Sequence, residues 1–171
     1  NKGFIDWIKA VDSDVRSIAD FGCGLGVGFK EAFSNKEYIG VDISERNIDW
    51  CTNNNKNPRH KYICMDFISN DLDEKADVVI CNGTLENVWN INLGLKNMVK
   101  NSSKWIYATC FRGWFPDLKS HQYKWVEKQG VYSSFISPSE SKQVLESLNC
   151  SDIKIFPSER RSGEYETIII A

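Results

Sequence analysis

Glycines and carboxylates lie close together near the start of the chain, in a pattern suited to holding a charged ligand. The apolar run Ser17–Phe21 predicts a buried strand, and Gly22, Gly24 and Gly26 follow it directly. Glycines at such a point allow a tight turn and a close approach of the backbone to a ligand. A helix that begins next would add N–H groups that favour negative charge. We therefore expect a ligand-binding loop here.

The residues around this loop narrow the class of ligand. The lysine of a phosphate-binding loop is missing, which counts against a nucleoside triphosphate. A dinucleotide loop would carry a small residue where Val27 stands, so an NAD-dependent oxidoreductase is less favoured. Asp20 lies two residues before Gly22, where it would repel a pyrophosphate and attract an α-amino group. Asp42 ends the next apolar run and can accept hydrogen bonds from both ribose hydroxyls, since Ser44 already provides the cap of the following helix.

A second group of candidate residues lies in 110–137, a long connection that we expect to act as an acceptor-binding lid. Aromatic and polar side chains are mixed there, which suits sugar or aromatic rings. His121 is the candidate general base for a hydroxyl acceptor, and Asp117 is the reserve. The alternative is that the aromatic residues form a small satellite core and that His121 is a surface residue.

Hydrophobic periodicity predicts the elements that position these residues. The expected helices are Phe4–Val11, one that begins at Phe29–Phe33, Ser44–Asn54, Asn92–Lys100 and Ser137–Leu148. The expected strands are Ser17–Phe21, Tyr38–Asp42, Tyr62–Met65, Asp77–Asn82, Trp105–Ala108, Ile153–Phe156 and Thr167–Ile170. Apolar strands that alternate with helices predict a parallel sheet, and the short last connection requires an antiparallel pair. The fold class is therefore α/β, a doubly wound, mostly parallel seven-stranded sheet with a final antiparallel strand and helices on both faces.

Length and composition fit one domain over residues 1–171. The chain begins with Asn1 rather than Met, which leaves open a neighbouring domain in a longer chain. No apolar run approaches the ~20 residues of a membrane span, and no long basic run favours nucleic acid. The six cysteines are widely spaced, so we expect no metal site and no disulfide framework, but reduced thiols in the cytoplasm.

Four motifs in order along the chain resemble those of class I, Rossmann-like S-adenosylmethionine-dependent methyltransferases. The first is the glycine-rich Asp20-Phe21-Gly22-Cys23-Gly24-Leu25-Gly26. The others are Gly40-Val41-Asp42-Ile43-Ser44, Cys64-Met65-Asp66-Phe67 and the segment Asp77–Glu86. The resemblance covers residues 16 to about 110 and implies S-adenosylmethionine as cofactor, with S-adenosylhomocysteine as product.

The resemblance also implies roles for the matching positions. Asp20 and the backbone of Gly22, Cys23, Gly24 and Gly26 would hold the methionine part. Asp42 would hold the ribose, with Ile43 against the adenine. Asp66 would accept a hydrogen bond from the adenine amino group, with Phe67 beside the ring. Asn82 and Gly83 would pass beneath the methionine end, near the transferred methyl group.

The acceptor is predicted less directly. The sequence Asn82-Gly83-Thr84-Leu85 lacks the Pro-Pro-Tyr that follows the fourth strand in many amine-directed relatives. Thr84–Val88 is similar to the Leu-Glu-His-Val stretch of small-molecule methyltransferases, but Asn87 replaces the histidine. We expect O-methylation of a small polar or glycosyl hydroxyl. The alternatives are N-methylation of a small-molecule or peptide amine, and a non-catalytic cofactor-binding module.

Overall fold

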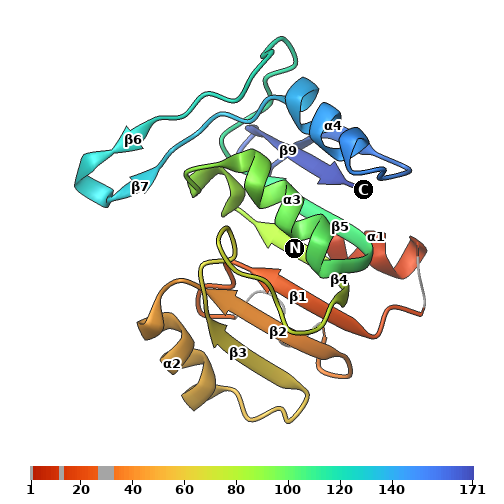
Figure 1. Ribbon diagram of the computed structural model, residues 1–171, viewed down its shortest axis with the longest axis vertical. Coiled ribbons are helices and arrows are strands. Elements are labelled where there is room, and N and C mark those ends of the chain that lie inside the picture. The colour runs from red at the N-terminus through yellow and green to blue at the C-terminus, as the bar shows by residue number, and fades with distance from the viewer. Residues whose placement is uncertain (1, 12–13, 27–32) are drawn as a thin grey trace.

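Seven strands pair into one sheet in the computed structural model, which describes residues 2–11, 14–26 and 33–171 (Figure 1). The strand order is β3-β2-β1-β4-β5-β9-β8. The strands are β1 (Ser17–Phe21), β2 (Glu37–Asp42), β3 (His60–Cys64), β4 (Ala76–Asn82), β5 (Ser102–Cys110), β8 (Lys154–Glu159) and β9 (Tyr165–Ile170). Neighbours pair in parallel except at β9, which is antiparallel to both β5 and β8. The predicted doubly wound sheet with one antiparallel strand is confirmed.

Helices cover both faces of this sheet. The helices are α1 (Lys2–Val11), α2 (Glu45–Asn54), α3 (Ile91–Asn101) and α4 (Pro138–Ser147). Successive residues of a strand point to opposite faces. In β1, Ile18 therefore packs in one core with Phe4 of α1, whereas Ala19 and Phe21 belong to the opposite core, which α3 and α4 complete. The strand ends that carry the candidate residues are thus fixed from both sides.

Two of the predicted helix starts are confirmed by their capping bonds. The Ser44 hydroxyl accepts a hydrogen bond from the backbone N–H of Asn47 at 3.3 Å and caps α2. The Ser137 hydroxyl accepts one from Glu140 N–H at 3.1 Å at the start of α4, with a proline in the first turn. The third strand begins and ends earlier than expected, which leaves Asp66 in the connection that follows it. The helix expected to begin at Phe29–Phe33 falls on residues outside the described part of the chain, apart from Phe33.

The connection 110–137 contains regular structure that the sequence did not predict. Two short strands, β6 (Trp125–Val126) and β7 (Val131–Tyr132), pair into a hairpin. The 3-10 turn Glu127–Gln129 and Gly130, at φ +62°, close the hairpin. Figure 1 shows the hairpin reaching away from the sheet beyond α3. The lid segment is therefore a structured arm rather than an irregular loop.

Candidate active site

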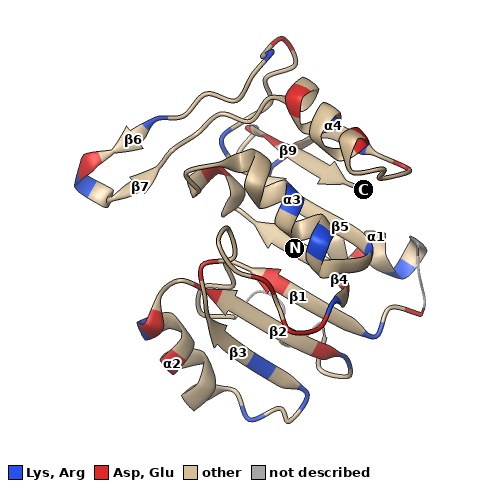
Figure 2. Ribbon diagram, in the orientation of Figure 1, with Lys and Arg blue, Asp and Glu red and all other residues tan. Residues whose placement is uncertain are grey.

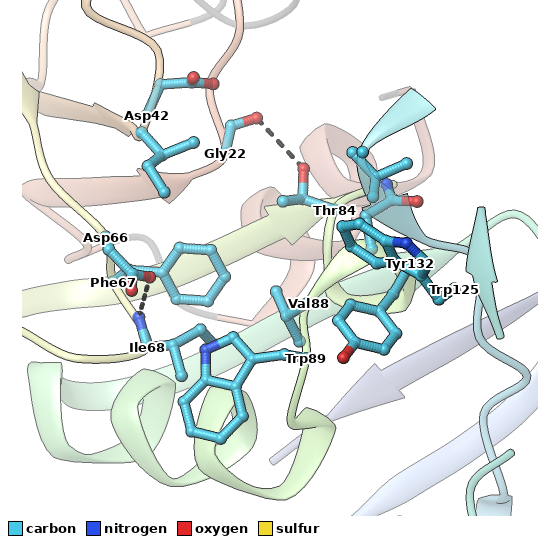
Figure 3. A pocket seen from close by; sticks show the side chains of 14 residues that line it. Gly22, Asp42, Asp66, Phe67, Ile68, Thr84, Val88, Trp89, Trp125 and Tyr132 are labelled. Carbon is cyan, nitrogen blue, oxygen red and sulfur yellow. Dashed lines mark hydrogen bonds between the residues drawn. The ribbon is translucent and has the colours of Figure 1, made fainter. Parts of the chain in front are cut away.

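A cavity of about 330 Å³ opens at the carboxyl ends of β1, β2 and β4, the edge where open α/β sheets bind ligands. Its volume lies in the range of about 300–1,000 Å³ that is typical of small-molecule sites. One wall, at the strand ends, is formed by Gly22, Asp42, Ile43, Asp66 and Phe67. The opposite wall comes from the hairpin and is formed by Trp125, Gly130, Val131 and Tyr132 (Figure 3). The cavity therefore joins the predicted cofactor residues to the predicted lid.

The glycine loop turns tightly at the floor of this cavity. The backbone N–H groups of Gly22 and Cys23 both donate to the carbonyl oxygen of Val41, at 2.8 and 2.9 Å. Gly22 has φ +79°, and a Cβ placed on it would lie 2.2 Å from the hydroxyl oxygen of Thr84. Only glycine fits there. Gly24 is also in the left-handed region, but a Cβ on it would meet nothing within 4 Å, so the space beside it is open.

Asp42 ties this loop to the start of α2. One carboxylate oxygen accepts a hydrogen bond from Gly24 N–H at 2.8 Å, and the other accepts from Ser44 N–H at 2.9 Å and from the Asn47 amide at 3.3 Å. A carboxylate has about four acceptor positions, so capacity remains for hydroxyl donors from the cavity. The carboxylate is thus held in place and can still accept from a ribose.

The strand-end wall continues with a flat apolar surface. The ring of Phe67 is buried against Phe21, with 4.9 Å between ring centroids, while Ile43 is 73% exposed. Beside them Asp66 accepts from Ile68 N–H at 3.0 Å and from the Ser69 hydroxyl at 2.8 Å, which fixes its carboxylate. Figure 3 shows Asp66 and Phe67 on the same side of the cavity as Asp42. Apolar side chains beside an oriented carboxylate fit a planar base with an amino group.

Asp20 and Cys23 lie outside the lining of this cavity. Asp20 is 3% exposed, and one of its carboxylate oxygens accepts a hydrogen bond from the Tyr38 hydroxyl at 2.7 Å. Burial raises the pKa of Asp20 to about 7, although the bond from Tyr38 lowers it. Burial also raises the pKa of the Cys23 thiol, which disfavours the reactive thiolate. Neither side chain therefore lines the cavity in this structure.

Asn82 and Gly83, at the end of β4, do not line the main cavity. Gly83 has φ +69°, and a Cβ on it would lie 2.4 Å from the ring of Phe111, so that ring packs directly on the backbone. Asn82 lines a second, smaller cavity. Gly26 packs near Tyr62 and Cys51 rather than in the main cavity. The structure therefore gathers five of the eleven predicted cofactor residues on one wall and places the other six around it.

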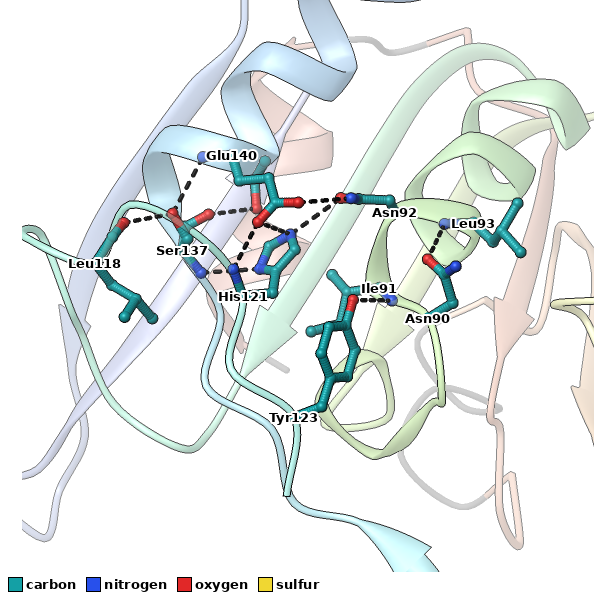
Figure 4. A network of polar contacts seen from close by, with 10 residues as sticks. Asn90, Ile91, Asn92, Leu93, Leu118, His121, Tyr123, Ser137 and Glu140 are labelled. Atoms are coloured by element: carbon teal, nitrogen blue, oxygen red, sulfur yellow. Dashed lines mark hydrogen bonds and ion pairs between the residues drawn. The ribbon is translucent and has the colours of Figure 1, made fainter. Parts of the chain in front are cut away.

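His121 has a structural position instead of facing the cavity (Figure 4). Its side chain is 1% exposed, and its Nδ1 accepts a hydrogen bond from Ser137 N–H at 2.9 Å. Its Nε2 is therefore the protonated nitrogen, and it donates to Asn92 Oδ1 at 3.1 Å. Burial lowers the pKa of His121, although Glu140 lies nearby. The only lone pair of the neutral ring is occupied, so this geometry leaves no free nitrogen to act as a base.

The base of the lid segment is held by several backbone bonds besides His121. Gln122 and Phe135 exchange N–H···O bonds at 3.0 and 2.8 Å, and Ser134 N–H donates to the carbonyl oxygen of Glu86 at 2.8 Å. The buried carboxylate of Glu86 accepts from Phe111 N–H at 2.9 Å, and burial raises its pKa. Asp117, the reserve base, is exposed and lines neither wall of the cavity. The hairpin is thus anchored firmly at its base.

Three aromatic side chains line the far side of the cavity. Trp125 and Tyr132 pack edge to face, with ring centroids 5.1 Å apart, and Trp89 from the β4–α3 connection lies near them. The many aromatic residues in 110–137 predicted a binding role for the segment that contains Trp125 and Tyr132. Trp89 was missed, because a single tryptophan in a short connection gives no sequence signal that separates a binding residue from a core residue.

The charge distribution, the lengths of the helices and the positions of possible metal ligands bear on three further expectations. Figure 2 shows basic and acidic residues interspersed along the described elements, without a continuous basic stripe in the part of the chain that is drawn. Among the described residues, none of the helices is long and apolar enough to cross a membrane. No group of three or more histidines, cysteines or carboxylates in these residues could hold a metal ion.

Comparison with known proteins finds a family model that matches part of this chain. Residues 19–101 match the family model of a methyltransferase domain. A ubiquinone biosynthesis O-methyltransferase of Rickettsia bellii is 28% identical, over 85% of this chain and 66% of that relative, so the chain spans slightly less than two thirds of its length.

Solved structures share the fold at lower identity. The magnesium protoporphyrin IX methyltransferase of Synechocystis, crystallised with bound S-adenosylmethionine, superposes with TM-score 0.71 and 16% identity, over 99% of this chain and 76% of that one. A Burkholderia thailandensis N1-methyltransferase with bound S-adenosylhomocysteine gives TM-score 0.77 and 13% identity over the same shares. Together with the glycine loop and the strand order, these matches show that the chain has the class I methyltransferase fold and is similar to S-adenosylmethionine-dependent methyltransferases.

Proposed function

We propose that this chain transfers the methyl group of S-adenosylmethionine to a hydroxyl of a small acceptor bound beneath the hairpin. The observation that carries the proposal is the single cavity that joins the strand-end acids to an aromatic wall. The O-methyltransferase name of the Rickettsia relative and the absence of the Pro-Pro-Tyr motif after Asn82 support a hydroxyl rather than an amine.

The residues of the strand-end wall would hold the cofactor. Asp42 would accept from the ribose hydroxyls, Asp66 would accept from the adenine amino group, and Ile43 and Phe67 would contact the base. When bound, S-adenosylmethionine supplies a methyl group on a sulfonium, which needs only an aligned nucleophile. The residues of the strand-end wall would therefore bind and orient the cofactor.

The hairpin wall would hold the acceptor. Trp125, Tyr132 and Trp89 offer aromatic surfaces that stack on a flat or saturated ring, so a glycosyl or phenolic hydroxyl fits this side. The anchored hairpin base keeps the wall in place above the strand ends.

The six cysteines are free thiols, which supports a reducing compartment such as the cytoplasm.

Incubation with methyl-labelled S-adenosylmethionine and a panel of sugars, phenols, amino sugars and peptides tests the proposal. We expect label in an ether product and formation of S-adenosylhomocysteine that Trp125→Ala reduces, while Trp105→Ala, on the opposite side of the sheet, serves as the control. Label in amines alone would replace the proposal with N-methylation. Cofactor binding without turnover on any acceptor would favour a non-catalytic module.

A further inference from the structure

A second cavity, of about 120 Å³, lies on the α1 side of the sheet at the carboxyl ends of β4 and β5. Asn82 and Thr109 come from the ends of these two strands, and Glu166 comes from β9. The side chains of Phe4, Ile80, Tyr107 and Phe111 form its apolar part. A cavity that combines an amide, a hydroxyl and a carboxylate can bind a small polar group through several hydrogen bonds at once.

This cavity lies next to the proposed cofactor site. Asn82 lines the small cavity and Thr84 lines the large one, and only Gly83 separates them. No more than about 7 Å of extended chain can therefore separate their Cα atoms. The Thr84 hydroxyl donates to the carbonyl oxygen of Gly22 at 3.4 Å, which ties this point to the glycine loop.

The carboxylate of Glu166 is held in this second cavity. Its side chain is 17% exposed, and Arg160 lies 3.9 Å away. The guanidinium of Arg160 also lies 4.9 Å from the centroid of the Phe111 ring. Glu164 pairs with the same arginine at 3.7 Å but is 73% exposed and does not line the cavity. Two carboxylates therefore pair with Arg160, and of the two only that of Glu166 lines the small cavity.

We infer that an acceptor held at the hairpin wall extends its nucleophilic hydroxyl past Gly83 into the small cavity, and that Glu166 is the catalytic base. This inference rests on the proposed function. The acceptor oxygen forms a bond to the methyl carbon as the carbon–sulfur bond breaks, and the sulfonium becomes a neutral thioether. The hydroxyl proton passes to the Glu166 carboxylate, while Asn82 and Thr109 orient the oxygen.

Sinefungin tests this assignment without a known acceptor, because it carries an amine where S-adenosylmethionine carries the transferred methyl group. An ammonium at that point would pair with Glu166. We expect calorimetry to show that the unmodified chain binds sinefungin more tightly than S-adenosylhomocysteine. Glu166→Gln should lower the affinity for sinefungin about tenfold or more and leave the affinity for S-adenosylhomocysteine unchanged. Glu164→Gln, the matched control, should leave both affinities unchanged.

Unaltered S-adenosylhomocysteine affinity in Glu166→Gln also shows that the variant is folded. If that variant loses structure, Glu166→Asp, which keeps the charge, should retain part of the preference for sinefungin. If Glu166→Gln prefers sinefungin over S-adenosylhomocysteine as strongly as the unmodified chain does, the role of Glu166 is overturned. The proposed function would still stand. If the unmodified chain binds neither compound, the proposed function itself fails.

Discussion

The burial of Asp20 predicts how the free energy of unfolding depends on pH, which can be tested without any ligand. In the folded chain this carboxyl is buried and bonded only to the Tyr38 hydroxyl among the contacts of the described residues, and its pKa is raised from 3.8 to about 7. Between these pH values the folded chain binds more protons than the unfolded chain. The free energy of unfolding should therefore fall as pH rises from about 4 to about 7, and then level off.

The magnitude follows from the size of the shift. A rise of about 3 pKa units corresponds to about 4 kcal/mol between the two ends of this range. Asp20→Asn removes the titration and keeps an oxygen that can accept from Tyr38. The variant should therefore gain stability over the unmodified chain as pH rises from 4 to 8, by a few kcal/mol in total.

Urea unfolding followed by tryptophan fluorescence, in half-unit steps from pH 4 to 8, measures this difference. Tyr38→Phe provides a second perturbation, because loss of the donated bond raises the pKa of Asp20 further and extends the decline to higher pH. Parallel curves for the unmodified chain and Asp20→Asn would show that Asp20 is already ionised at pH 5 in the folded state. The reasoning from burial would then be refuted.

Two further variants test the loop and the lid. Gly22→Ala should lower both the melting temperature and the affinity for S-adenosylhomocysteine, because its Cβ would lie 2.2 Å from Thr84; unchanged values in calorimetry would contradict the loop geometry. His121→Ala should cost about 1–3 kcal/mol in urea unfolding, because Ser137 N–H loses its acceptor, and should leave cofactor affinity unchanged. Since burial lowers the pKa of His121, its contribution to stability should be lost as pH falls below about 6.5. A variant of full stability that has lost methyl transfer would restore His121 as a base.

Local chemistry explains why much of the fold could be predicted. The strand Ser17–Phe21 is bounded by its own apolar run and by the glycines after it, and the observed strand has the same ends. Ser44 and Ser137 cap helices through bonds to residues three positions later, which a sequence shows directly. These features depend on neighbours in the chain.

Features that depend on distant partners could not be predicted. His121 has a suitable type and a suitable loop for a base, but Asn92 and Ser137 occupy its two nitrogens, and no sequence pattern reports those contacts. The hairpin strands are two residues long, too short for a periodic signal. Glu166 was missed because it lies in an ordinary final strand, and only the sheet order brings it near Asn82.

Calorimetric titration with S-adenosylhomocysteine tests most directly whether a nucleoside lies across the strand ends. The unmodified chain should bind one equivalent, and Asp42→Ala should bind roughly ten- to a hundredfold more weakly, since hydrogen bonds to a charged acceptor contribute about 1.5–3 kcal/mol. The Asn47 amide donates to the same carboxylate from the α2 side. Asn47→Ala should therefore change the affinity much less than Asp42→Ala. No binding heat with either S-adenosylmethionine or S-adenosylhomocysteine, or equal affinity in Asp42→Ala, would contradict the account.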